Sequence, residues 1–319
     1  MAQICRVSGS FLRKRFDYLY CLRVLERMSQ EISLAPLDES RTSLPRIRVI
    51  RPPSFSLLGL WSSLRELWKY RDLLYTLTAH RIKVRYKQSV LGVAWAVLQP
   101  LSLMLIYTLV FAVVARIPTG GTPYPVIAFT GLLVWSLFST ALTSSTSGLV
   151  SHSHLVTKVY FPREILPLTY VFAAVFDFLI AIVVLAGIMI YYHVAPTTNI
   201  ILALPIVCIL ICFVTAMSLV FSATQVRFRD VGVAMPLLLQ LWMFASPVVY
   251  PLSAVPERFR SLYSLNPMVG IVDGFRTAVV GGAVPELCTF AVSAVISILL
   301  LPAAYLYFKH VEATIADVI

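Results

Sequence analysis

The side chains of this 319-residue chain that could perform chemistry are few, and their spacing fits no known kind of reactive site. Cys208 and Cys212 share a helix face, but both lie in an apolar run, where cysteine usually packs as a small hydrophobic residue. His152 and His154 are two residues apart, so a helix would point them in different directions. The five cysteines lack metal-ligand spacing. The sequence therefore predicts no metal site, no catalytic residue and no cofactor bound by this chain.

Asp177 is an acidic residue in the middle of a long apolar run. A central aspartate costs about 2.5–3.5 kcal/mol, while each surrounding Leu, Ile, Phe or Val returns about 0.3–0.6 kcal/mol, so membrane insertion is still favoured. Two interpretations stay open. Asp177 lines or couples a transport path, or its carboxylate faces the helix bundle and hydrogen-bonds to a neighbouring helix.

Two enzymatic or transport classes lack their sequence signals here. An intramembrane transferase or ligase needs several acidic or basic catalysts gathered at one face, whereas the predicted spans contain a single acidic residue, Asp177. A secondary transporter would show matched broken helices in two related halves, and we find no such repeat. No G-x-x-x-x-G-K-[ST] loop occurs that could cradle nucleotide phosphates. We expect a transport subunit that is not itself an enzyme.

The composition is that of a membrane protein. Hydrophobic residues make up 59% of the chain and charged residues 13%, against about 45–50% and about 25% in soluble domains. The net charge of +11 could indicate nucleic-acid binding, but the basic residues crowd before the first apolar run. That distribution indicates membrane orientation and anionic lipid instead, so no nucleic-acid partner is expected.

Six apolar stretches reach the length of about 20 residues that a membrane span needs. They run from Leu91 to Ala115, Tyr124 to Thr143, Ile165 to Tyr192, Ile200 to Ala223, Val231 to Tyr250 and Leu287 to Phe308. The predicted fold is therefore an all-α integral membrane protein with six transmembrane helices. Most of the 26 lysines and arginines fall on one side of these spans, which places both termini in the cytoplasm.

The stretch from Leu64 to Ser89 predicts an amphipathic helix lying in the membrane interface. Its apolar residues recur at helical spacing, and Trp68 and Tyr75 suit the depth of lipid headgroups. Its end alternates basic and apolar residues, which leaves a strand as the alternative. The basic residues are candidate contacts for a lipid pyrophosphate or headgroup, although positive-inside bias explains them equally well: Arg81, Lys83, Arg85 and Lys87.

Three connections between the predicted spans differ in character. "SHSHLVTKVYFPREILPL", from Ser151 to Leu168, is longer than a turn requires and mixes apolar with polar residues. A helix this short is unstable alone, so we expect it to dock on a partner. "TQVRFRDVG", from Thr224 to Gly232, is a short charged connection that fits a plain turn and a partner contact equally well. Residues 251–286 hold apolar pieces of about 10 residues, which suit re-entrant or interfacial helices.

Three stretches resemble a known family. They are "YRDLLYTLTAHRIKVRYKQSVLGVAWAVLQPLSLMLIYTLVF" from Tyr70, "KVYFPREILPL" from Lys158 and "NPMVGIVDGFRTAVVGG" from Asn266. These sequences resemble the permease subunits of ABC-2 type exporters, and most of all those that export lipid-linked O-antigen polysaccharide. Permeases for capsule and teichoic acid are also similar. The resemblance covers the chain from about Leu64 to Lys309.

The resemblance implies a homodimer of six-span subunits in the bacterial inner membrane, bound to two ATP-hydrolysing subunits that carry ATP and magnesium. Residues 152–163 would form a coupling helix seated in the ATPase, and the turn near Asp230 would make a second contact. The implied ATPase contacts are His154, Leu155, Val156, Lys158, Tyr160, Phe161, Pro162, Arg163, Arg227, Arg229 and Asp230. Two short external helices would gate the exit, with Asn266, Pro267, Asp273 and Arg276 as gate residues; an external lid without a gating role is the alternative.

The predicted cargo is a lipid-linked polysaccharide; another cargo, such as capsule, teichoic acid, a small lipid or a drug, is the alternative. Aromatic faces can slide along sugar rings as they do along stacked bases, although an interfacial belt or core packing explains most of them. The candidate lining residues are Tyr107, Trp135, Phe138, Asp177, Trp242, Phe244 and Tyr250.

The predicted organisation has four parts. Residues 1–60 form a disordered or loosely membrane-associated cytoplasmic extension, and 61–90 form the interface helix and the entry to the first span. Residues 91–310 form the transmembrane domain, and 311–319 a cytoplasmic tail.

Overall fold

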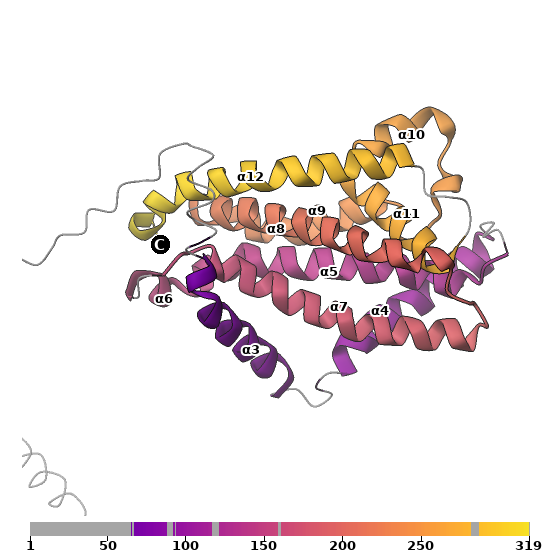
Figure 1. The fold of residues 1–319 in the computed structure, drawn as a ribbon, viewed down its shortest axis with the longest axis horizontal. Coiled ribbons are helices and arrows are strands. Elements are labelled where there is room, and N and C mark those ends of the chain that lie inside the picture. Colours follow the sequence, from indigo (N-terminus) through magenta and orange to yellow (C-terminus); the bar gives the residue numbers. More distant parts are fainter. Residues whose placement is uncertain are drawn as a thin grey trace, which may run out of the picture. The chain divides into compact units, whose positions relative to one another are not determined.

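The computed structural model describes Arg65 and residues 67–87, 92, 94–116, 121–158, 161–281 and 287–318 (Figure 1). The predicted extension at 1–60, Tyr160 and residues 282–286 lie outside the described residues, as does the side chain of Lys158.

The described residues form helices, turns and loops. The helices are α3 (Arg71–Lys87), α4 (Ala94–Tyr107), the π-helix η2 (Thr108–Val114), α5 (Tyr124–Ser151), α6 (Ser153–Lys158), α7 (Ile165–Tyr191), the 3₁₀-helix η3 (Thr198–Leu202), α8 (Ala203–Arg227), α9 (Asp230–Phe244), the 3₁₀-helix η4 (Leu252–Ala254), α10 (Glu257–Ser264), α11 (Pro267–Val280) and α12 (Leu287–Val318). The strand alternative for residues 81–87 is wrong, because they continue α3. The residues predicted as a tail from 311 onward continue α12 to Val318.

Within the part of the chain that the structure describes, five helical segments are long and apolar enough to cross a membrane. They are Ala94–Val114, Tyr124–Ser151, Ile165–Tyr191, Thr198–Arg227 and Cys288–Glu312. Each corresponds to a predicted span.

The predicted span from Val231 to Tyr250 is not one continuous helix. It begins as α9, whose 15 residues reach about 22 Å at 1.5 Å per residue, short of a bilayer core of about 30 Å. Irregular backbone follows from Ala245 to Tyr250. Pro247 is the physical reason, because the residue before a proline is pushed out of helical geometry.

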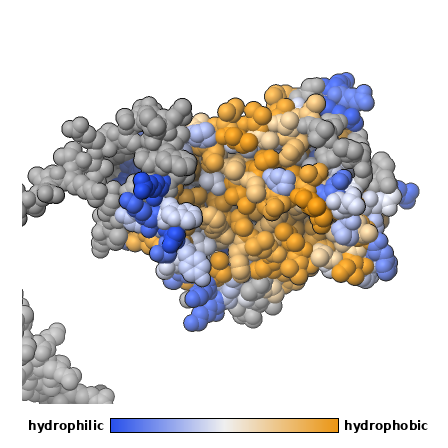
Figure 2. All heavy atoms as spheres, viewed as in Figure 1, coloured by the Kyte–Doolittle hydropathy of each residue, from blue (hydrophilic) through white to orange (hydrophobic). Residues whose placement is uncertain are grey.

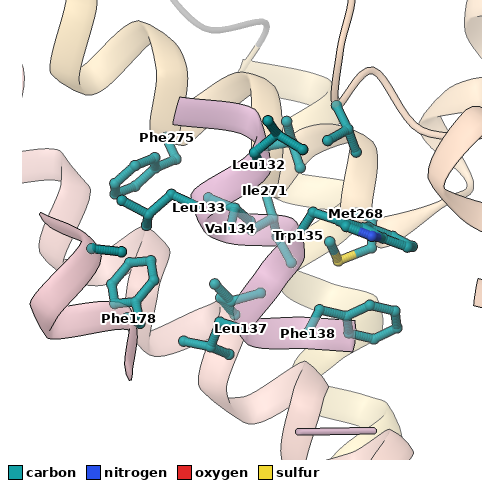
Figure 3. Close-up of a cluster of buried hydrophobic side chains, with 14 of the residues drawn as sticks. Leu132, Leu133, Val134, Trp135, Leu137, Phe138, Phe178, Met268, Ile271 and Phe275 are labelled. Carbon is teal, nitrogen blue, oxygen red and sulfur yellow. The ribbon is translucent and has the colours of Figure 1, made fainter. Parts of the chain in front are cut away.

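Helix α5 is the centre of the bundle. It packs against α4, α7, α8, α9 and α11, and nineteen of its residues, from Tyr124 to Leu149, are buried. Figure 3 shows Leu132, Leu133 and Trp135 among side chains that include Phe178 of α7 and Phe275 of α11. These contacts join helices far apart in the sequence into the main apolar core.

A second apolar core lies at one end of the bundle, where α6 and the C-terminal part of α12 are found (Figure 1). Val156, Phe161, Ile165 and Phe308 are buried there, and apolar residues of the α3 region, including Leu73, pack against them. Helix α10 lies at the opposite end of the bundle.

The outer surface is apolar around the middle of the bundle. Figure 2 shows a broad hydrophobic band with hydrophilic residues gathered toward both ends. Large hydrophobic side chains are exposed along α4 and η2, α7, α9 and α12. A surface of this kind is stable in contact with lipid tails or with other apolar helices, and not with water.

Candidate coupling segment and transport path

The predicted coupling segment is a short helix between two long ones. Helix α5 ends at Ser151. The next residue, His152, leaves helical geometry with φ of −112° and ψ of 31°, and α6 then leads the chain toward α7. His154 is exposed and Leu155 is half-buried. Val156, Phe161 and Pro162 are buried within the chain, where they fix the segment to the bundle.

A polar network ties the end of this segment to α12. The Lys309 ammonium lies 2.9 Å from a Glu164 carboxylate oxygen and 2.8 Å from Glu312. The Tyr305 hydroxyl donates to Glu164 at 3.0 Å. The Arg163 guanidinium donates to the Glu312 carbonyl at 2.5 Å, so this residue, predicted as an ATPase contact, also bonds within the chain.

Glu164 is the most deeply buried ionisable group of that network. Its side chain is almost fully buried, and burial raises the pKa of its carboxyl, while the Lys309 ammonium opposes that rise. Glu164, Lys309 and Glu312 were not among the site residues predicted from the sequence. A signal was present, because Glu164 directly precedes one predicted span and Lys309 directly follows another, where an ion pair can form.

The second predicted contact, at the turn between α8 and α9, lies at the surface. Arg227, Arg229 and Asp230 are all exposed. The buried Gln225 holds the turn by donating from its side-chain amide to the Arg229 carbonyl at 3.1 Å. The three predicted residues are therefore free of the core and face outward together.

Helix α3 is attached to α7 through Arg81. The guanidinium carbon lies 3.5 Å from the ring centroid of Tyr170, Nη2 donates to the Tyr170 hydroxyl at 2.5 Å, and Nη2 is 3.1 Å from His152 Nε2. Since His152 is the last residue before α6, Arg81 links the interface helix to the start of the coupling segment. A groove of about 330 Å³ between α3 and α7 is lined by His80, Arg81, Arg85 and His152 together with apolar residues, Thr169 and Tyr170.

A second attachment involves the embedded aspartate. Arg85 Nη1 and the Tyr86 hydroxyl both donate to the Asp177 carboxylate. Asp177 is twelve residues into α7, about 18 Å from its start, so the C-terminal end of α3 reaches well along that helix. The carboxylate thus hydrogen-bonds to a neighbouring helix, as one of the two interpretations expected. Of the other basic residues on α3, Lys83 and Lys87 are exposed.

Asp177 and Trp135 also line the larger cavity of the bundle. This cavity, of about 550 Å³, lies among α3, α4, α5 and α7, with Met243 of α9 at its edge. Polar residues from all four of these helices contribute to its wall: Arg85, Tyr86, Gln99, Ser136, Ser139, Thr140 and Asp177. Gln99, Ser136, Ser139 and Thr140 were not among the predicted lining residues.

The other predicted lining residues have different surroundings. Phe138 is fully buried between Phe213, with stacked rings 5.6 Å apart, and Trp242, with an edge contact at 5.1 Å. Phe138 therefore packs in the core. Phe244 is exposed, while Tyr107 and Tyr250 are half-buried.

Residues 244–250 form a break, buried from Ser246 to Val249, in which each backbone carbonyl has a partner. The carbonyls of Pro247, Val248 and Tyr250 accept from the Arg276 guanidinium at 2.8, 2.9 and 3.3 Å. Those of Phe244, Ala245 and Val249 accept from the side chains of Tyr250, Asn266 and Tyr124 at 2.8, 3.1 and 2.6 Å. The Ser246 carbonyl accepts from Val248 N at 2.7 Å. Non-helical backbone at membrane depth is stable when it is buried and satisfied in this way.

Two of the four predicted gate residues, Asn266 and Arg276, donate hydrogen bonds to this break. Asn266 caps α11 by accepting from Met268 N and also accepts from the Trp242 indole, both at 3.1 Å. Pro267 is the first residue of α11. Asp273 lies 3.9 Å from Arg276. The carbonyl contacts were not foreseen, because their partners are irregular backbone with no side-chain signal.

Comparison with known proteins agrees with this architecture. The family model for the ABC-2 type transporter matches residues 72–280. The O-antigen export system permease protein RfbA of Myxococcus xanthus is 35% identical over 257 residues, which are 79% of this chain and 97% of that protein. A protein of the same name from Klebsiella pneumoniae is 30% identical over 212 residues, 66% of this chain and 81% of its own length. The polysialic acid transport protein KpsM of Escherichia coli is 26% identical over 212 residues, 64% and 80% of the two chains. This multi-pass membrane protein belongs to the ABC-2 type transporter family.

Proposed function

We propose that this chain is the permease subunit of an ATP-driven exporter that moves a lipid-linked polysaccharide such as O-antigen across the bacterial inner membrane. The observation that carries the proposal is the 35% identity to an O-antigen export permease over nearly the whole of that protein. Capsular polysaccharide is the second candidate cargo, and the similarity to a polysialic acid transport protein favours it.

In this proposal, ATP-driven movement of the ATP-binding subunits is transmitted to the permease through α6. Two copies of an ATP-binding subunit hold ATP and magnesium, and each contacts the exposed His154 and half-buried Leu155, with Arg227, Arg229 and Asp230 as a second contact. Helix α6 joins α5 to α7, and the Glu164–Lys309 pair joins α7 to α12. A displacement of α6 is therefore delivered to three membrane helices at once.

The cargo is first met on the cytoplasmic side. The groove lined by His80, Arg81, Arg85 and His152 contains no acidic residue among its described lining, which suits an anion such as a lipid pyrophosphate. Lys83 and Lys87 face outward and would contact headgroups.

The sixth span and the dimer complete the proposed assembly. Helix α9 together with residues 245–250 forms the sixth, broken span. Helix α11, buried among α5, α8 and α12, is a re-entrant helix that with α10 forms the external gate. A second copy covers part of the apolar surface of α4, η2 and α9, where Leu105, Leu109 and Leu237 are exposed. We place both termini in the cytoplasm: the end of α12 lies at the same end of the bundle as α6, the proposed ATPase contact, and most basic residues precede the first span.

Reconstitution tests the proposal. The chain and an ATP-binding subunit from the same organism are co-expressed, purified and placed in proteoliposomes with a lipid-linked O-antigen. We expect ATP-dependent transfer of the glycan across the bilayer, with a dimeric permease in the complex. The chain purified alone should hydrolyse no ATP and move no glycolipid. Either activity in the absence of the ATP-binding subunit would contradict the proposal.

A further inference from the structure

The wall of the larger cavity carries polar side chains from α3, α4, α5 and α7. Gln99 lies near the start of the first span, and Thr140 lies in the middle of α5. Among the described residues, neither the Gln99 carboxamide nor the Thr140 hydroxyl has a hydrogen-bond partner. Polar side chains at membrane depth are expensive unless they face a partner, water or a ligand, and they commonly mark a path or a site.

The charge of this cavity is balanced. Among the described residues that line it, Arg85 and Asp177 are the only charged ones, and they are paired with each other. A charged ligand would leave one charge uncompensated in a poorly solvated place, whereas a neutral ligand would not. The adjoining groove is different, because its described lining carries Arg81 and Arg85 and no carboxylate.

The two spaces share Arg85. An anionic group in the groove and a neutral group in the cavity would therefore lie on either side of one guanidinium. The cavity offers the groups that hydroxyl-rich ligands use: a carboxylate, a carboxamide and hydroxyls for hydrogen bonds, and the faces of Trp95 and Trp135 for the apolar side of a ring. Its volume of about 550 Å³ falls in the range of small-molecule sites.

We propose that this cavity binds an uncharged sugar, namely the sugar attached directly to the anionic link of the lipid-linked cargo. This inference rests on the proposed function and adds to it the residues that select the cargo. Asp177, Gln99 and Thr140 hydrogen-bond to the hydroxyls of that sugar, and Trp95 packs on its ring. Arg85 holds Asp177 in place and lies toward the link.

Ligand pairs test the inference on the unaltered protein. The full chain, in complex with its ATP-binding subunit in lipid nanodiscs, is titrated with a polyprenyl diphosphate carrying one hexosamine and with the bare polyprenyl diphosphate. We expect the glycosylated ligand to bind about tenfold more tightly, the gain from one or two additional hydrogen bonds. Equal affinities overturn the inference and leave the proposed function standing; failure of both ligands to bind counts against the proposed function itself.

Substitutions locate the effect. The double variant Gln99→Leu and Thr140→Val should lose most of the preference for the glycosylated ligand while it binds the bare diphosphate within about twofold of wild type. Trp95→Leu should act in the same direction, and Trp68→Leu is its matched control, because Trp68 is exposed and outside the cavity lining. Arg81→Gln should weaken both ligands.

A bilayer phospholipid is the competing occupant, and the same samples distinguish it. Native mass spectrometry of the complex would then show a co-purified phospholipid that Gln99→Leu with Thr140→Val removes, without any difference between the two diphosphates. That result overturns the sugar assignment. Displacement of any bound phospholipid by the glycosylated ligand, and not by the bare one, supports it.

Discussion

At the scale of single residues, Arg85 and Arg276 each bind polar groups of other elements of the chain. Arg85 pairs with an aspartate on another helix, and Arg276 donates to the backbone carbonyls of Pro247, Val248 and Tyr250. Asp177 and the carbonyls of Pro247 and Val248 are half-buried or buried, so the loss of either arginine leaves acceptors unsatisfied. The consequences of substitution therefore differ from those of surface arginines.

The Arg85–Asp177 pair should show coupling in a double-mutant cycle. Asp177→Asn and Arg85→Gln should each lower the unfolding temperature of the purified protein, because each strands a charge. The double variant should lose less than the sum, with a coupling energy of about 1 kcal/mol, since the removal of both partners leaves no uncompensated charge. Strictly additive losses would mean that the two side chains do not interact.

Arg276→Lys should be destabilising although the charge is kept. A lysine ammonium cannot reproduce the planar fork that serves the carbonyls of Pro247, Val248 and Tyr250. We expect a loss of about 2–4 kcal/mol in unfolding free energy, from two or more buried acceptors left unsatisfied. Arg258→Lys on α10, an exposed arginine, is the control and should change stability little. Equal effects of the two substitutions would contradict the role assigned to Arg276.

At the scale of elements, α5 owes its central position to close approach of other backbone. A Cβ atom added at Gly131 would lie 2.0 Å from the Val248 carbonyl oxygen and 2.9 Å from Arg276 Nη2. At Gly187 of α7, nothing lies within 4 Å of the added atom. The first glycine is thus required by packing and the second is not.

Gly131→Ala should push α5 away from the break at residues 244–250. The expected loss is about 1–3 kcal/mol, the usual effect of overpacking, measured as a lower unfolding temperature in detergent. Gly187→Ala is the matched control and should be neutral or stabilising by up to about 1 kcal/mol, because alanine favours the helix. A stable Gly131→Ala variant would show that the break does not hold α5 closely.

The tie between α7 and α12 predicts a dependence on pH. Burial raises the pKa of Glu164, so the folded state favours the protonated carboxyl. The stability that this proton contributes is therefore lost as the pH rises from the ordinary pKa of glutamate through the higher pKa of Glu164 in the folded state. Lys309 opposes this, and Glu312 and Tyr305 also face the site. Lys309→Met should therefore steepen the fall in unfolding temperature between acidic and neutral pH. Adding Glu164→Gln should flatten it again; an unchanged slope in Lys309→Met would contradict the assignment.

At the scale of the whole molecule, the proposed contact between α6 and the ATP-binding subunit can be tested at the residues of α6 that are not buried. His154→Glu with Leu155→Arg should release the ATP-binding subunit in co-purification while the permease remains folded and dimeric, because both side chains are accessible. Arg258→Glu, exposed at the opposite end, should leave the complex intact. A variant of His154 and Leu155 that retained the ATP-binding subunit would count against α6 as the contact.

Much of this architecture was predictable from local sequence. The spans at Tyr124, Ile165 and Leu287 follow from runs of apolar residues, because the free energy of transferring a helix into lipid is a sum over neighbouring residues. The helical nature of α3 and the clustering of basic residues before the first span are local in the same sense. The stretch between α5 and α7 stood out because its polarity departs from both flanks.

Contacts between distant residues were decided only by the tertiary structure. Asp177 meets a cation that lies 92 positions earlier in the chain, which no local pattern reports. The predicted fifth span is broken at residues 245–250, and it is stable because Arg276, Asn266 and Tyr124 supply donors from three other places in the sequence. Hydropathy determines which segments enter the membrane. It does not determine which polar groups will find partners there, because that depends on how the helices pack.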